Sequence, residues 1–224
     1  MEHKIKSTFV LLIVINSFLS LVVADADTGY MTWKHAASIT NAALTGNHTD
    51  LVTLQQSAGL GNVNAETSLG EYYRQEKNYV KAAYLWQKAA IQRDAFAEFL
   101  VGRAYYEGQG VPQNPAKASY WFKKSAKQGN TDAEFSLGIF YWNGYGTPKN
   151  YARANYWYLK AAEQGYAYAE YNLGMSYYYG QGVPKNYAKT DYWWQKAAMQ
   201  GAAPAENNLG NSYYYGQGVP KKHE

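Results

Sequence analysis

The sequence predicts an all-α protein, a right-handed α/α superhelix built from helix–turn–helix repeats. A Gly that follows Leu or Val recurs with spacings of 32, 36, 36 and 36 residues, at Gly70, Gly102, Gly138, Gly174 and Gly210. Each unit holds two helical patterns joined by a short turn. No segment shows the period-two alternation of a half-buried β-strand. These observations together indicate a solenoid of stacked hairpins.

Residues 1–24 are predicted to be a secretory signal peptide. Lys4 and Lys6 precede an apolar run, Phe9–Val23, and small residues at Ala24 and Ala26 fit a cleavage pattern. The alternative is an uncleaved membrane anchor, but a spanning helix needs roughly 20 apolar residues and this run is shorter. We therefore expect cleavage, and no membrane span afterwards. Because the chain has no Cys, we expect export to the periplasm or the exterior of a bacterium.

Residues 25–61 are predicted to form a degenerate first repeat. Leu54–Gly61 resembles the second half of the later repeats, and a first helix is expected within Tyr30–Leu44. Two-helix repeats then fill residues 62–220, although the last has only its first helix and turn, and 221–224 form a polar tail. Solenoid ends need a polar cap. We expect this end to be covered by a partner, to self-associate with a second copy, or to fray.

The first helix of each repeat, helix A, is best defined at about Ala133–Trp142. Its recurring small and apolar positions, such as Leu137, Gly138 and Tyr141, share one face at 100° per residue. A Gly inside a helix costs about 1 kcal/mol relative to Ala. Its recurrence at one position therefore indicates a neighbouring helix that comes too close for a Cβ.

The second helix, helix B, follows a Gly-x-Gly-x-Pro turn, in which Gly supplies a left-handed cap and Pro stops helix A. The expected N-cap residues of helix B are Asn114, Asn150 and Asn186. Helix B carries tryptophans that we expect in the core, Trp121, Trp157 and Trp193, and ends at Gly129, Gly165 and Gly201. The unit that starts at Ala65 differs, because it lacks the Gly-rich turn and has Arg93 where the others have Gly.

The repeated pattern A-E-x-x-L-G-x-x-Y…G-x-G-V-P…A-x-x-x-x-W-x-x-K-A-A-x-Q-G resembles the Sel-one-like repeat (SLR) family, a branch of the tetratricopeptide-like (TPR-like) α-solenoids. The resemblance covers roughly Leu54–Pro220. It implies A helices on a concave surface and roles in protein interaction, including host interaction in some pathogens. Some bacterial relatives are described as β-lactamases or penicillin binders, but they are Cys-rich. This chain has neither Cys nor Ser-x-x-Lys, so a β-lactamase-like hydrolase is the least favoured alternative.

Composition and motifs predict no catalytic, cofactor-binding or metal-ligating residue. The formal net charge of +4 is too small to indicate a nucleic-acid face. A Glu recurs at the start of helix A, at Glu66, Glu98, Glu134, Glu170 and Glu206, where it favours the helix dipole. A Lys recurs on helix B, at Lys88, Lys124, Lys160 and Lys196. We expect exposed ion pairs between these two sets, worth about 0–1 kcal/mol each.

Variation among the repeats predicts a partner-binding face on the A helices, opposite the recurring positions. The predicted binding residues are Arg103, Glu107, Ile139, Asn143, Asn172, Met175, Tyr179, Asn208, Asn211 and Tyr215. Tyr offers rigid contact area at low entropy cost, and Asn adds hydrogen bonds. The leading hypothesis is a non-catalytic scaffold that binds a protein or an extended peptide in envelope assembly or host interaction. The alternative is a solenoid that binds glycan or peptidoglycan.

Overall fold

The computed structural model describes residues 48–215, and every regular element in this range is a helix. The helices are α3 (His48–Gly59), α4 (Val63–Gln75), α5 (Tyr79–Ile91), α6 (Ala95–Glu107), α7 (Pro115–Lys127), α8 (Thr131–Asn143), α9 (Tyr151–Glu163), α10 (Ala167–Tyr179), α11 (Tyr187–Met199) and α12 (Ala203–Tyr215). The all-α prediction is confirmed. The predicted signal peptide, the helix expected within residues 30–44 and the polar tail 221–224 lie outside the described residues.

The chain divides into two compact units, residues 1–72 and 73–224, and the boundary falls inside α4. In the first unit, Leu54 and Ala58 of α3 and Ala65 of α4 are buried. Gly61 between these helices has a φ of 82°, and the Asn62 side chain caps α4 by accepting from the Ala65 N–H at 3.0 Å. Helix α3 and the left-handed Gly61 therefore lie where the sequence predicted the second half of a degenerate repeat.

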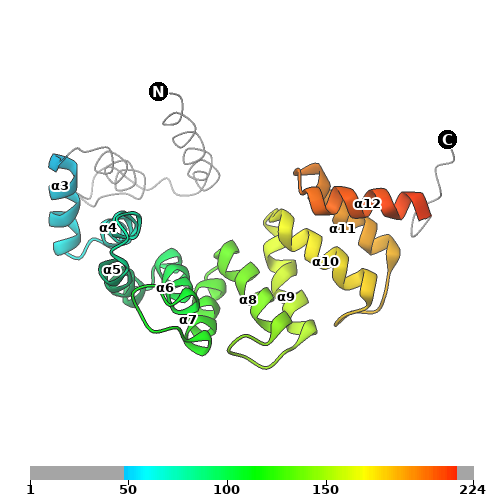
Figure 1. Cartoon of the computed structure of the whole chain (residues 1–224), viewed down its shortest axis with the longest axis horizontal. Helices are drawn as coiled ribbons and strands as arrows, with labels where there is room; N and C mark the ends of the chain where they lie inside the picture. The colour runs from blue at the N-terminus through cyan, green and yellow to red at the C-terminus, as the bar shows by residue number, and fades with distance from the viewer. Residues whose placement is uncertain (1–47, 216–224) are drawn as a thin grey trace. The chain divides into compact units, whose positions relative to one another are not determined.

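In the second unit, α5 to α12 pack in chain order as successive hairpins (Figure 1). Helices α4 to α12 have 13 residues each. The difference between the 32- and 36-residue spacings therefore arises in the turns. Residues 76–78 replace the seven-residue turn that is found at 108–114.

The recurring Gly of helix A is required by contact with helix B, as predicted. A Cβ on Gly102 would lie 2.6 Å from the ring of Phe122. The equivalent overlaps are between Gly138 and Tyr158 and between Gly174 and Trp194. All three aromatic side chains are buried. One ring per hairpin thus fills the space that each Gly leaves.

The expectation that Trp121, Trp157 and Trp193 form the core is wrong by one residue. Each is only half-buried, and the buried ring belongs to the next residue along helix B. Consecutive helical residues differ by 100° in direction. The Trp therefore turns to the flank of the hairpin, where Trp157 makes an edge contact with Tyr156 at 4.9 Å between ring centroids.

The turns use their two glycines for different purposes. The first adopts a left-handed φ of 72–82° and ends helix A, at Gly108, Gly144 and Gly180. The second also has positive φ, and a Cβ there would overlap the backbone at the start of the preceding repeat's helix B. These contacts are between Gly110 and Tyr79, Gly146 and Pro115, and Gly182 and Tyr151. Each turn therefore joins one repeat to the repeat before it.

The predicted Asn caps of helix B are present. The side-chain oxygens of Asn114, Asn150 and Asn186 each accept a hydrogen bond at 2.9 Å from the backbone N–H three residues later. Asn78 caps α5 in the same way at 3.3 Å, although its turn is shorter. The cap therefore survives the change in turn length.

The predicted pairing of the repeated Glu and Lys is present at Glu98 and Glu170, but the expectation that these pairs are exposed is wrong, because both carboxylates are buried. Glu98 accepts a hydrogen bond from the Gln128 amide at 2.7 Å and forms an ion pair with Lys124 at 3.1 Å. Glu170 has the same arrangement with Gln200 at 2.7 Å and Lys196 at 3.2 Å. The Gln that follows helix B thus holds the start of helix A from inside the hairpin.

Glu134 shows how a single substitution changes this arrangement. It keeps the Gln164 amide at 2.8 Å, but Lys160 forms its ion pair with Glu163 at 3.5 Å. Burial raises the pKa of Glu134, and the Gln164 hydrogen bond and the more distant Lys160 charge lower it only in part. The other two complete hairpins have Lys127 and Met199 at the position of Glu163, so Lys124 and Lys196 meet no competing carboxylate there.

We predict that Arg93→Gly stabilises the protein by about 0.5–1 kcal/mol. Arg93 has a φ of 68°, whereas the equivalent Gly129 has a φ of 83°. A left-handed L-residue costs about 1–2 kcal/mol, part of which is offset by the greater freedom of Gly in the unfolded chain. Chemical denaturation checks the change. Gly129→Ala is the matched control and should destabilise, and a destabilised Arg93→Gly protein would contradict the interpretation.

Candidate functional site

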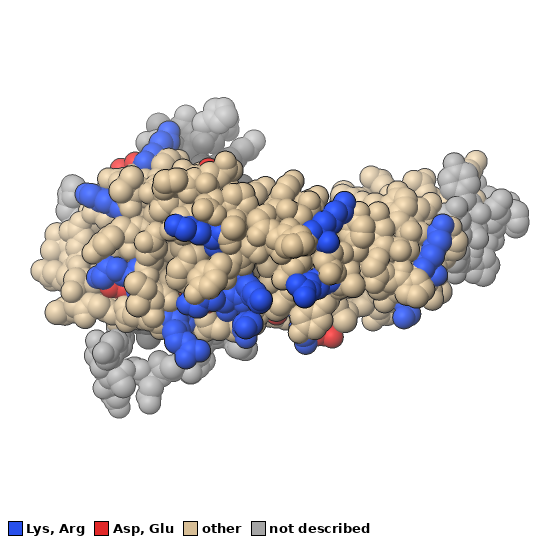
Figure 2. Space-filling view, turned by 90° about the horizontal axis from the view of Figure 1, so that it is seen from below, with Lys and Arg blue, Asp and Glu red and all other residues tan. Residues whose placement is uncertain are grey.

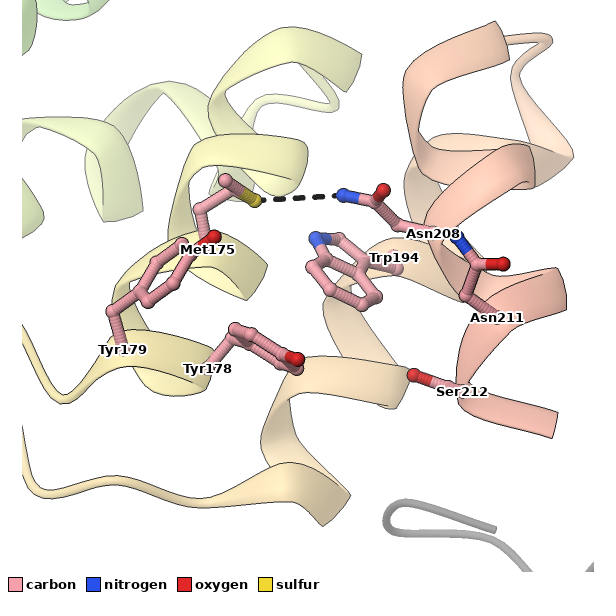
Figure 3. A pocket seen from close by; sticks show the side chains of 7 residues that line it. All are labelled: Met175, Tyr178, Tyr179, Trp194, Asn208, Asn211 and Ser212. Carbon is pink, nitrogen blue, oxygen red and sulfur yellow. Dashed lines mark hydrogen bonds between the residues drawn. The ribbon is translucent and has the colours of Figure 1, made fainter. Parts of the chain in front are cut away.

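A pocket of about 370 Å³ lies between α10, α11 and α12 (Figure 3). It is lined by Met175, Tyr178 and Tyr179 of α10, Trp194 of α11, and Asn208, Asn211 and Ser212 of α12. In Figure 3 the aromatic side chains extend from α10 and α11 and the amides extend from α12 on the other side. We call this the α10–α12 pocket. Its volume lies within the range of ligand pockets in proteins.

Four of the ten predicted binding residues line this pocket: Met175, Tyr179, Asn208 and Asn211. They come from two successive A helices, as the variation among the repeats indicated. Asn208 spans the gap, since its amide nitrogen lies 3.5 Å from the Met175 sulfur and 3.4 Å from the Tyr171 hydroxyl. Tyr179 is 59% exposed, so its ring is available to a partner.

The other predicted residues do not join a common site. Arg103 forms an ion pair with Glu107 at 3.5 Å on the same helix, and the Asn143 amide donates to the Ile139 carbonyl at 3.0 Å. The side chain of Asn172 forms a hydrogen bond with Tyr158. The side chain of Tyr215 lies outside the description. The face on α6 and α8 is thus occupied by contacts within its own repeats.

One repeat position that borders the pocket varies in size among the A helices. Phe140 occupies this position in α8, and its ring packs on Phe122 and Tyr106 at centroid distances of 5.1 and 5.2 Å. Thirty-six and 72 residues later the position is Ser176 and then Ser212. Ser212 lines the pocket, whereas Ala104 and Ser176 are buried at the same position, so a small residue here does not by itself open a pocket.

Three pocket residues were not among the predicted set: Tyr178, Trp194 and Ser212. Trp194 holds the core position that was expected at Trp193. Its indole N–H donates to the Tyr171 carbonyl at 3.2 Å. Tyr178 lies 5.6 Å from Trp194 between ring centroids. Comparison of this position across the repeats does not single out Ser212, because Ala104 and Ser176 are small there as well.

No charged side chain lines the pocket. Its walls offer aromatic rings, a thioether, amides and a hydroxyl, which suit apolar, aromatic or amide-bearing groups. The nearest described cation on the aromatic wall is Lys185, whose ammonium lies 5.7 Å from the centroid of Tyr178. The lining therefore favours recognition of uncharged groups over acid–base chemistry.

A buried carboxylate lies next to Ser212. Asp191 of α11 is 7% exposed, and neither of its oxygens has a hydrogen bond of good geometry within the described chain. Burial raises the pKa of Asp191, and its contact with the Ser212 hydroxyl lowers the pKa only in part. The equivalent residue one repeat earlier is Asn155, which accepts from the Ser176 hydroxyl at 2.6 Å and donates to the Gln181 carbonyl at 2.7 Å. Asp191 has no side-chain N–H, so it cannot donate the second of these hydrogen bonds.

We predict that Asp191→Asn stabilises the protein by about 1 kcal/mol at pH 7, because it removes a poorly paired buried charge. The pKa of Asp191 is higher in the folded than in the unfolded state. The wild type should therefore gain stability relative to the variant as the pH falls through the raised folded pKa towards 3.8. Urea denaturation between pH 7 and pH 4 checks both effects. A gap that widens on acidification would contradict this assignment.

Among residues 48–215, no group of three or more His, Cys, Asp and Glu side chains could hold a metal ion. In the same range, no helix has the length and apolar character to cross a membrane.

Comparison with protein families identifies the repeat. The Sel1 repeat matches residues 63–94, 95–130, 131–166, 167–201 and 203–224. The chain belongs to the Sel1 repeat family. Proteins of this family are generally protein-interaction scaffolds and typically non-catalytic. No curated protein sequence matches the chain.

Two solved Sel1 repeat structures are similar over most of this chain. A protective antigen present in uropathogenic Escherichia coli, which displays an SLR fold, has 30% identity and a TM-score of 0.79 over 86% of this chain. This chain spans only 43% of that protein. A Sel1 repeat protein from Oxalobacter formigenes has 29% identity and a TM-score of 0.79, covering 85% of this chain and 79% of its own.

A third structure, described as a putative Sel1 repeat protein from Klebsiella pneumoniae, has a TM-score of 0.51 and 19% identity. It covers 80% of this chain and 92% of its own, and it supports the fold alone.

Proposed function

We propose that this Sel1 repeat protein is a non-catalytic scaffold that holds a protein or an extended peptide on its A helices. The observation that supports this most strongly is the α10–α12 pocket, because four of the residues predicted from repeat variation line it. An uncharged pocket with an exposed Tyr suits one apolar or aromatic side chain of a partner.

We also propose that the protein is exported and acts in the bacterial periplasm or exterior, in envelope assembly or host interaction. The charged start, apolar run and small residues of 1–26 support export. The similar E. coli protein is a protective antigen, and an antigen is a molecule that a host meets. Host interaction is therefore a reasonable setting for this chain as well.

Export predicts a processed N-terminus. Mass spectrometry of the protein from its native host should find a chain that begins at Asp25 or Asp27. An intact Met1 in the membrane fraction would contradict export by cleavage and would favour an anchor.

A second candidate function is glycan or peptidoglycan binding. It is supported by the same pocket, because aromatic rings beside Asn208 and Asn211 also suit a sugar ring and its hydroxyls. The two candidates differ in ligand rather than in site, so they can be separated by direct binding. No residue that lines the pocket supports a β-lactamase-like hydrolase.

The binding test compares a peptide library with purified cell-wall sacculi. We predict that Tyr179→Ala weakens binding about 30-fold, the effect of losing a hot-spot Tyr worth about 2 kcal/mol. Ser212→Phe should also block binding, because it introduces a ring at a position that lines the pocket, as Phe140 does at the equivalent position of α8. Binding of a library peptide to the wild-type protein supports the scaffold function. Binding of the wild-type protein to sacculi alone supports glycan or peptidoglycan binding.

The matched control is Tyr156→Ala, an equally exposed Tyr on α9. It should leave binding unchanged. Tyr158→Ala is the stability control, because this core ring is 2% exposed and its loss should cost about 3–5 kcal/mol. If Tyr179→Ala binds as well as Tyr156→Ala, the pocket is not the binding site. If it melts as early as Tyr158→Ala, Tyr179 is a packing residue.

A further inference from the structure

A row of exposed cations runs along the edge formed by the turns between helix A and helix B. We call it the turn-edge row. Four members occupy the third position of α5, α7, α9 and α11, namely Lys81, Lys117, Arg153 and Lys189. Two more, Lys149 and Lys185, lie in the turns just before α9 and α11. All six are exposed.

Each cation of the row lies over a Tyr ring. The helical four pair with the Tyr in the third position from the end of the preceding helix A, which is Tyr73, Tyr105, Tyr141 and Tyr177, at 4.8, 5.2, 5.6 and 5.1 Å from the ring centroids. Lys149 and Lys185 lie 4.8 and 4.9 Å from Tyr151 and Tyr187. The rings hold the cations in place before any ligand arrives, which lowers the entropy cost of binding.

None of the six cations forms an ion pair with a described carboxylate. The paired cations lie elsewhere, as Lys124 does with Glu98. The carboxylates nearest in sequence to this edge are Glu76, in the short turn, and Glu107, which is paired with Arg103. Viewed from below, the surface shows many Lys and Arg side chains and few of Asp and Glu (Figure 2).

The row is continuous from one repeat to the next. The second Gly of each turn contacts the start of the preceding helix B, as Gly146 does at Pro115 and Gly182 at Tyr151. The turn that carries Lys149 is therefore placed beside the first turn of α7, which carries Lys117. The turn that carries Lys185 is likewise placed beside the start of α9, which carries Arg153. A linear ligand would meet cations from successive repeats in order.

The chemistry of the row favours carboxylates over ligands that stack. Single-stranded nucleic acids bind by stacking bases on open aromatic faces. Here the cations cover the rings, and none of Tyr105, Tyr141 and Tyr177 is exposed. The same six cations lie along a line, whereas a membrane surface would engage a plane of basic and projecting apolar side chains.

We propose that the turn-edge row binds an extended polypeptide segment rich in Asp and Glu. The helices that carry the cations of successive repeats have one A helix between them, as α8 packs between α7 and α9. An extended chain rises about 3.3 Å per residue, so a segment with Asp and Glu at intervals along its length can bring carboxylates to the cations of successive repeats. This surface is separate from the α10–α12 pocket, so it does not depend on the function proposed for that pocket.

The test measures binding of poly-L-glutamate to the purified protein by isothermal titration calorimetry at 50 mM NaCl. The triple variant Lys117→Gln, Arg153→Gln, Lys189→Gln should bind about 3- to 150-fold more weakly than the wild type, since each exposed charge contributes about 0.2–1 kcal/mol. The control variant Lys123→Gln, Lys127→Gln, Lys160→Gln removes the same charge from B-helix positions outside the row. It should stay within about twofold of the wild type.

Two further measurements on the wild type make the result independent of how the variants fold. Raising NaCl to 300 mM should weaken poly-L-glutamate binding, because screening acts on exposed charges. Oligo-dT, heparin and phosphatidylglycerol vesicles should each bind more weakly than poly-L-glutamate at matched charge. Equal losses in the two triple variants, no salt dependence, or tighter binding of any of these three probes would overturn the proposal. Tyr179→Ala should leave poly-L-glutamate binding unchanged, which separates this surface from the pocket.

Discussion

The contact between one glycine of helix A and one aromatic ring of helix B is the constraint on which the repeat depends. At Gly102, Gly138 and Gly174 the ring of the following helix lies where a Cβ would be. The two helices can therefore pack closely, and the buried Glu at the start of helix A meets the Gln after helix B at 2.7–2.8 Å. The core rings, the Glu–Gln hydrogen bonds and the turns occupy fixed positions in each repeat. The remaining positions are therefore free to differ between repeats.

The site includes positions that are free to differ among the repeats. Phe140 completes an aromatic cluster with Phe122 and Tyr106 in the middle of the solenoid. Ser212, at the same repeat position in α12, lines the pocket together with Trp194, the ring that lies against Gly174. A solenoid can thus carry a pocket in one repeat while its backbone keeps the same geometry.

The sequence alone was sufficient for features that depend on backbone geometry. Left-handed turn glycines, Asn caps and the small residue at Gly138 follow from local rules, and each is in place. Features that depend on which of two adjacent side chains faces inward were not predictable. Trp157 and Tyr158 are both aromatic and differ by 100° in direction, and only packing of the facing helix decides between them. The burial of Glu98 likewise depends on Gln128, which lies 30 residues away.

Charge separates the surfaces of the second unit. Helices α6, α8, α10 and α12 carry six acidic residues and one basic residue, whereas α5, α7, α9 and α11 carry ten basic residues and two acidic ones. Most A-helix carboxylates lie in the first turn, where the helix dipole favours them. The cations at the start of helix B oppose the dipole of their own helix, but each lies over a Tyr in the last turn of helix A, where a positive charge is favoured. The hairpin can therefore keep a row of exposed cations that a single helix would disfavour. The α10–α12 pocket and the turn-edge row are formed by residues at different repeat positions, so each surface can change without the other.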